Sequence, residues 1–243
     1  MYTCETDHCS CKIGFQVSWR FVYIVEYFGP LLIHPLVFFL RQYLYPNIPI
    51  KPLAASVDGD LSPSQKLLFG MMMLHFLKRE IETIFVHKFS ASTMPAWNIF
   101  RNSAFYWFLG GLLSALDVYH PRSLAARDQD PLVNYLGLAL YVFGEGMNVA
   151  VHLHLSSLRS RGGTERKIPT GLGFGLVTCP NYMYEVVAWL GMIIVSRSWA
   201  VALSIAVGIL YMRAWAIGKE RSYRKQFGDK YKKKKWGMLP GFF

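Results

Sequence analysis

Long apolar blocks, separated by polar or proline-rich segments, dominate the pattern along this chain. Each block is about 20 residues long, the length that an α-helix needs to cross the hydrocarbon core of a bilayer. The sequence therefore predicts an all-α membrane protein, a polytopic bundle of about six transmembrane helices. Gly29, Pro30 and Pro35 are expected to break the first helix. The six blocks run over about 17–40, 67–89, 99–116 and 132–155, from 179 onward, and over about 199–217.

The second block carries many ionisable residues in a helical pattern. Four apolar residues recur at spacings of three and four and form one stripe: Leu74, Leu77, Ile81 and Phe85. A second, mostly ionisable stripe consists of His75, Lys78, Arg79, Glu82 and Val86. Because a charge that faces lipid costs roughly 2.5–3.5 kcal/mol, this stripe is expected to face protein or a wet cavity. We interpret the block as a membrane helix that lines a polar catalytic cavity. The alternative is a soluble amphipathic helix with a solvated face.

Polar residues in two other blocks extend this interpretation. Glu26 lies at membrane depth in the first block, where it either faces the cavity, which we favour, or is an interfacial carboxylate. In the fourth block, Glu145, Asn148 and His152 are spaced by three and four. The same helix face continues to Arg159, beyond the membrane edge. Such a face suits a ligand with a polar body and an anionic end, whereas helix–helix hydrogen bonding by Asn148 is the alternative.

Positive charge is the other strong feature of the composition. The net charge is +11, and most of the excess lies in residues 156–167, with four Lys or Arg, and in residues 218–243, with nine. Loops of this kind are typical of the cytosolic side of a membrane, so an even number of spans predicts that both termini are cytosolic. The clusters fit anionic phosphate groups better than nucleic acid, because no nucleic-acid-binding motif accompanies them.

Two weaker patterns indicate neither a metal nor a nucleotide loop. Cys4, His8, Cys9 and Cys11 crowd the start of the chain, but their spacing matches no closed zinc site, so we expect no metal. The glycines at 171, 173 and 175 follow no predicted strand, which argues against a Rossmann or Walker phosphate loop.

Four strings carry a resemblance to one family: EYFGPLL at 26–32, KREIETIFVHKFSASTMP at 78–95, RKIP at 166–169 and CPNYMYE at 179–185. They resemble the very-long-chain trans-2-enoyl-CoA reductases of the steroid 5α-reductase superfamily. The resemblance covers about residues 13–243 and implies one transmembrane catalytic domain there, whereas residues 1–12 match nothing. Members of this family begin with a ubiquitin-like domain that the sequence lacks, so we expect a truncated gene model or protein.

The resemblance implies the last step of fatty-acid elongation, in which NADPH reduces very-long-chain trans-2-enoyl-CoA to acyl-CoA. It also implies an endoplasmic reticulum membrane location, contact with membrane lipid, and other elongase-complex subunits as partners. Glu26 and His75 match the substrate end of the family's cavity. The positions that match the cofactor site are Asn148, His152, Arg159, Lys167, Asn181, Glu185, Lys219 and Tyr223.

The catalytic groups implied by the resemblance differ from those of steroid reductases. Phe76 stands where steroid reductases have the tyrosine that polarises the substrate carbonyl. In the enoyl-CoA branch, Lys78 and Tyr182 match the residues regarded as essential. Hydride delivery to the β-carbon puts charge on the thioester oxygen, which needs a cation or donor, and the α-carbon then needs a proton. We assign Lys78 to the oxygen and Tyr182 to the proton, and the two roles could be exchanged.

Three alternatives compete with this interpretation. A steroid or polyprenol reductase would perform the same chemistry on another substrate, but Phe76 and the intact KRExET string weigh against it. A membrane methyltransferase of the isoprenylcysteine type would have no use for a cavity with Glu26 and Lys78. The third alternative is an inactive, truncated paralogue that acts as a partner in the elongase complex.

Overall fold

A computed structural model of the protein describes residues 14–89, 93–160 and 167–242. The segment 1–12, with its cysteines, and the basic residues Arg161 and Arg166 lie outside the described residues. The elements η1 and η2 are π-helical, whereas η3 and η4 are 3-10 turns. In chain order the elements are β1 Gln16–Ser18, α1 Trp19–Asn47, α2 Pro63–Ile81, η1 Glu82–Val86, β2 Thr93–Pro95, α3 Trp97–Ser103, η2 Ala104–Leu113, α4 Ser114–Val118, η3 Leu124–Ala126, α5 Pro131–Ser157, α6 Pro180–Ser196, α7 Trp199–Phe227 and η4 Gly228–Lys230.

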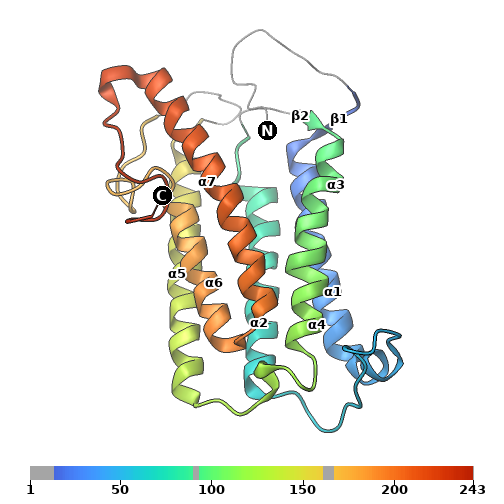
Figure 1. Cartoon of the computed structure of the whole chain (residues 1–243). Coiled ribbons are helices and arrows are strands. Elements are labelled where there is room, and N and C mark those ends of the chain that lie inside the picture. Colours follow the sequence, from blue (N-terminus) through green and yellow to red (C-terminus); the bar gives the residue numbers. More distant parts are fainter. Residues whose placement is uncertain (1–13, 90–92, 161–166, 243) are drawn as a thin grey trace.

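The long helical segments lie side by side as one bundle (Figure 1). They are α1, α2 with η1, α3 with η2 and α4, α5, α6, and α7. This architecture confirms the prediction of an all-α, multi-pass membrane protein. Among the described residues, three helices are long and apolar enough to cross a membrane by themselves, namely Trp19–Asn47, Pro131–Ser157 and Trp199–Lys230. Six as the number of spans therefore stays a prediction.

Two helices are longer than the apolar blocks that predicted them. α1 continues as one helix through Pro30 and Pro35, so the expected breaks do not interrupt it, and it ends seven residues after the predicted end at 40. Its last turns still pack, since Tyr45 is fully buried and donates to the Leu116 carbonyl oxygen at 2.9 Å. α7 likewise continues past the predicted end at 217 into the basic segment. Packing and helix propensity, not bilayer thickness, set these ends.

The inward and outward faces of α2 are those that its periodicity predicts. A capping box between Ser62 and Gln65, with Pro63 at the first position, starts the helix before the apolar block begins. Leu74, Leu77, Ile81 and Phe85 are 61%, 48%, 48% and 80% exposed and form an outer face suited to lipid. His75 and Glu82, on the opposite face, are almost fully buried. The polar stripe therefore points into the bundle.

The α2–η1 segment and α5 run in register with each other. Six of the hydrogen bonds between them join residues 70 apart in sequence, from Ser64 with Asn134 near one end to Ser156 with Val86 near the other. A constant separation means that the two segments run parallel. Residues spaced by three and four on one helix then lie opposite residues with the same spacing on the other. The polar face of α2 therefore meets the polar face of α5 along its length.

Glycines bring α5 and α6 into close contact. A Cβ atom at Gly144 would lie 2.4 Å from the backbone nitrogen of Ala188, and one at Gly191 would lie 2.4 Å from the Gly137 carbonyl oxygen. Small residues at such positions let two helix backbones approach inside a membrane. The start of α6 is thereby held against the polar face of α5.

Candidate active site

Glu145 of α5 is the centre of the polar cluster inside the bundle. Its Oε1 lies 2.6 Å from His75 Nδ1, and its Oε2 lies 2.5 Å from Lys78 Nζ. Lys78 Nζ also donates to Asn148 Oδ1 at 2.7 Å. The Glu145 and Lys78 side chains are only 12% and 15% exposed, so this is a largely buried ion pair that joins α2 to α5.

Asn148 and His75 extend the cluster to α6. Asn148 Nδ2 donates to the Asn181 carbonyl oxygen at 2.9 Å and to Glu185 Oε2 at 3.1 Å. His75 Nε2 lies 3.4 Å from Glu185 Oε1. The imidazole thus faces one carboxylate with each nitrogen. Three helices that are distant in sequence meet at this point, and each contributes at least one of the residues assigned to the site from sequence.

A second layer lies one helical turn further along α2 and η1. Arg79 Nη1 lies 2.8 Å from Glu82 Oε2, and Arg79 Nη2 donates to Tyr27 Oη of α1 at 3.0 Å. His152 Nδ1 lies 2.9 Å from Glu82 Oε1 and 3.4 Å from Arg79 Nη1. Because an ionised carboxylate only accepts, the 2.9 Å contact indicates the tautomer in which His152 Nδ1–H donates to Glu82, and Arg79 then cannot donate to the same nitrogen. This layer adds α1 to the cavity wall.

The charges of the two layers nearly cancel. Lys78 and Arg79 face the carboxylates of Glu82, Glu145 and Glu185, with His75 between two of them. Removal of one partner from a buried ion pair leaves an uncompensated charge, which is strongly destabilising. The cluster is therefore a set of mutually dependent groups, not a row of independent side chains.

Glu26, which is buried, and Tyr182, which is partly buried, lie near this region. Glu26 of α1 is 1% exposed, which excludes the interfacial alternative, and its Oε2 has no hydrogen-bond partner among the described residues. Tyr182, in the first turn of α6, packs against the apolar core with its ring centroid 6.4 Å from that of Trp215. Asn181, the preceding residue, binds the cluster directly. Both residues lie within the bundle, and their roles at the site stay predictions.

The other predicted cofactor residues lie toward the end of the bundle that carries the β1–β2 pair (Figure 1). Arg159 Nη1 donates to the Lys88 carbonyl oxygen at 2.6 Å, and Lys88 Nζ donates to the Arg159 carbonyl oxygen at 2.6 Å. Lys219 Nζ lies 5.2 Å from the centroid of the Tyr223 ring on α7. Lys167 is exposed, in the segment that leads to α6. The predicted cofactor residues thus comprise an inner polar group on α5 and α6 and an outer group of these four residues.

Comparison with known proteins identifies the family. The profile of the 3-oxo-5-alpha-steroid 4-dehydrogenase family matches residues 92–243. The chain belongs to this family. It is 42% identical over 231 residues to the very-long-chain enoyl-CoA reductase of Dictyostelium discoideum, covering 94% of this chain and 71% of that protein. A Caenorhabditis elegans protein named a probable very-long-chain enoyl-CoA reductase is 35% identical over 234 residues, covering 94% and 73%. The Mus musculus protein named trans-2,3-enoyl-CoA reductase-like is 29% identical over 237 residues, covering 94% and 62%. The resemblance drawn from the sequence strings is confirmed.

The central residue of the cluster in this family member was not assigned to the site from its sequence. The sequence places Glu145 on a polar face but does not predict it as a site residue. Nor does it predict Arg79, Glu82 or Tyr27 as site residues. The signal that identifies Glu145 is its spacing, because Glu145, Asn148 and His152 repeat the intervals between His75, Lys78 and Glu82. Only the constant separation of 70 residues in the structure turns those equal intervals into contacts.

One group of side chains has the composition of a metal site. Ligand-type atoms of Glu82, His87 and His152 lie within 4.8 Å of one another. Arg79, however, already places a cation 2.8 Å from Glu82 Oε2. A metal ion would have to displace this guanidinium or accept its repulsion. We therefore assign the group to the ion-pair network of the family member.

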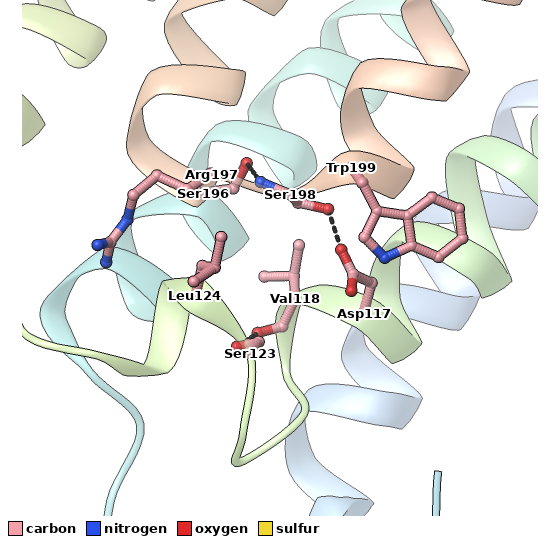
Figure 2. Close-up of a pocket in the computed structure, with 8 residues that line it drawn as sticks. All are labelled: Asp117, Val118, Ser123, Leu124, Ser196, Arg197, Ser198 and Trp199. Atoms are coloured by element: carbon pink, nitrogen blue, oxygen red, sulfur yellow. Dashed lines mark hydrogen bonds between the residues drawn. The ribbon is translucent and has the colours of Figure 1, made fainter. Parts of the chain in front are cut away.

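A small pocket lies at the opposite end of the bundle, between the end of α4, η3 and the turn from α6 to α7 (Figure 2). In Figure 2 the Ser198 hydroxyl points to the Asp117 carboxylate, and it donates a hydrogen bond there. The pocket contains none of the site residues predicted from the sequence. Its lining residues are Asp117, Val118, Ser123, Leu124, Ser196, Arg197, Ser198 and Trp199.

Proposed function

We propose that this protein reduces the 2,3 double bond of very-long-chain trans-2-enoyl-CoA, with NADPH as the reductant. The proposal is supported by the names of the relatives, which are 42% and 35% identical over 94% of the chain. It is also supported by a buried polar cluster that contains a lysine with an unused donor. The lysine is the single observation that carries the chemical argument.

Lys78 has the geometry of an oxyanion donor. Its ammonium group donates a hydrogen bond to Asn148 Oδ1 at 2.7 Å and forms an ion pair with Glu145 Oε2 at 2.5 Å. Glu82 Oε2, at 4.0 Å, is too far for a hydrogen bond. An ammonium has three donors, so one remains for a substrate oxygen. In a site of low dielectric constant, such a fixed cation strongly stabilises the charge that develops on the thioester oxygen.

Tyr182 is the group that we assign to proton donation. It lies inside the bundle in the first turn of α6, next to Asn181, whose carbonyl oxygen binds Asn148. After reduction at the β-carbon, the α-carbon needs a proton, and a phenol can serve as the general acid for that transfer. Glu26 and His75 would shape the substrate end of the same cavity, with His75 held between two carboxylates. Exchange of the roles of Lys78 and Tyr182 remains the alternative.

The residues present fit a reduced nicotinamide dinucleotide phosphate. Asn148, Asn181 and Glu185 offer the amide and carboxylate groups that a carboxamide-bearing ring requires, deep in the bundle. His152 adds an imidazole at the next turn. The outer basic residues, Arg159, Lys167 and Lys219 with Tyr223, offer cations for phosphate groups. When bound, the cofactor supplies the hydride.

The cellular setting follows from the same proposal. A very-long-chain thioester partitions its acyl chain into lipid, so a multi-pass enzyme in the endoplasmic reticulum membrane suits it. The basic segments favour a cytosolic location for both termini by the positive-inside rule. The substrate would then pass between this enzyme and other subunits of an elongase complex within the membrane.

An NADPH-consumption assay tests the proposal. The purified full chain in lipid nanodiscs should oxidise NADPH with a long-chain trans-2-enoyl-CoA and yield the saturated acyl-CoA, but not with an enone steroid. Phe76 supplies no hydroxyl for a steroid ketone, and it is buried against His75 and Tyr106. Lys66 is an exposed lysine on the same helix as Lys78, so Lys66→Met is the matched control for Lys78→Met and should keep full activity. Steroid reduction without enoyl-CoA reduction would overturn the assignment.

A further inference from the structure

Four consecutive lysines, Lys232–Lys235, lie between two anchored points of the C-terminal segment. The segment follows η4 and folds back against the residues that precede α6 (Figure 1). We name these four residues the lysine run. A run of like charges repels itself and is usually found in mobile, solvated tails. Here both of its ends are fixed to the folded protein.

The first anchor is Tyr231, directly before the lysine run. Its hydroxyl donates to Glu220 Oε2 of α7 at 2.7 Å, and the same oxygen accepts from Thr178 Oγ1 at 2.6 Å. Tyr231 is 7% exposed. Burial, followed by the neighbouring Glu220, raises the pKa of the Tyr231 hydroxyl, so it remains a donor throughout the neutral range. Glu220 thus joins α7, the start of the lysine run and the segment before α6.

The second anchor directly follows the lysine run. Thr178 N donates to the Trp236 carbonyl oxygen at 3.1 Å, and Cys179 N donates to the Gly237 carbonyl oxygen at 2.9 Å. The next side chain, Met238, is fully buried in the apolar core. Cys179 is the N-cap residue of α6, so this anchor lies immediately before Asn181 and Tyr182. The lysine run therefore ends beside the N-terminus of α6, the helix that contributes Asn181 and Glu185 to the candidate active site.

Most charged residues near the lysine run in sequence are basic. Lys234 and Lys235 lie over the rings of Tyr231 and Trp236, at 5.9 and 4.8 Å from the ring centroids. These contacts further restrict two of the four ammonium groups. In residues 221–235, Asp229 is the only acid in the sequence. The other basic residues of this stretch, all exposed, are Arg221, Arg224, Lys225 and Lys230.

We propose that the lysine run binds the phosphate-bearing coenzyme A portion of the enoyl thioester. This inference rests on the proposed function. The acyl chain and the thioester must enter the bundle to reach Lys78, whereas the coenzyme A phosphates are too polar to follow and have to remain at its aqueous end. An array of ammonium groups on an anchored backbone near the start of α6 offers those phosphates a complementary partner, with little loss of backbone entropy on binding. An anionic lipid surface would need only an unstructured basic tail, so the two anchors favour the substrate as the occupant.

The test compares two thioesters that carry the same acyl chain. One is the trans-2-enoyl-CoA, and the other is its N-acetylcysteamine thioester, which has no phosphate. The variant replaces all four residues of the lysine run with alanine, in the full chain in zwitterionic nanodiscs. Its matched control replaces Lys51 and Lys66, two exposed lysines at the opposite end of the bundle. Equilibrium binding of coenzyme A and of pantetheine, measured without turnover, is the second readout.

We expect the lysine-run variant to raise KM for the enoyl-CoA by about tenfold to a hundredfold, because each lysine near a phosphate contributes roughly one tenfold step or less. KM for the N-acetylcysteamine thioester, kcat and KM for NADPH should stay unchanged. The parent should bind coenzyme A more tightly than pantetheine, and this preference should disappear in the variant. An unchanged KM for enoyl-CoA overturns the inference. An equal rise in KM for both thioesters would indicate a role in lipid contact or folding and also overturns the inference. A rise in KM for NADPH alone overturns it as well. If the parent reduces neither thioester, the proposed function itself fails, and this inference fails with it.

Discussion

Lys78→Met changes both catalysis and stability at the centre of the candidate active site. Lys78 forms a 2.5 Å ion pair with Glu145 and a 2.7 Å hydrogen bond with Asn148, and it is 15% exposed. Removing one partner of a buried ion pair costs about 3–5 kcal/mol, mostly because the remaining charge is stranded. Loss of one oxyanion donor lowers turnover ~10²–10³-fold. The single substitution therefore produces both effects and cannot distinguish them.

The double variant Lys78→Met with Glu145→Gln removes the stranded charge. The glutamine keeps a carbonyl oxygen that can accept from His75 Nδ1, at the position of the 2.6 Å contact in the parent. We expect the double variant to recover most of the stability that Lys78→Met loses, since neither charge is then left unpaired. Turnover should stay ~10²–10³-fold below the parent, because no cation faces the thioester oxygen.

The assay is single-turnover hydride transfer at equal amounts of folded protein, combined with thermal unfolding in the same nanodiscs. Glu145→Gln alone is the third arm: it keeps the lysine but strands its charge, so it should be less stable than the parent and still transfer hydride faster per folded molecule than the double variant. Recovery of hydride transfer in the double variant, together with recovery of stability, would refute the catalytic role of Lys78. Tyr182 would then carry the chemistry without it.

Three further predictions use other parts of the structure. Lys167→Ala should raise KM for NADPH and weaken the preference for NADPH over NADH, because the 2′-phosphate needs a cationic partner; unchanged values for both would remove Lys167 from the cofactor site. A glycosylation tag fused after residue 243 should stay unmodified in intact microsomes, whereas modification would place the C-terminus in the lumen. Gly144→Ala should lower the unfolding temperature, because its Cβ would lie 2.4 Å from the Ala188 nitrogen, while Gly146→Ala, with no atom within 4 Å, should not. Equal melting temperatures for these two variants would contradict close packing of α5 on α6.

The sequence by itself determined which residues face inward. Helical periodicity is a local property, so spacings of three and four in residues 74–86 separate the exposed Leu74 and Phe85 from the buried His75 and Glu82 without knowledge of any neighbour. The same argument identified Glu145, Asn148 and His152 as one face. The family strings then assigned roles to several of these positions, and the relatives confirm the family.

The pairing between helices was decided only by the tertiary structure. His75 and Glu145 are 70 residues apart, and no local pattern states that α2 and α5 lie parallel with that offset. The approach of α6 depends on backbone contacts at Gly144, where the missing side chain is what matters. The anchoring of the lysine run depends on Glu220, which the sequence presents as one more charge in a basic helix. Contacts between distant segments depend on how all the helices pack together, and for that reason periodicity predicts faces but not partners.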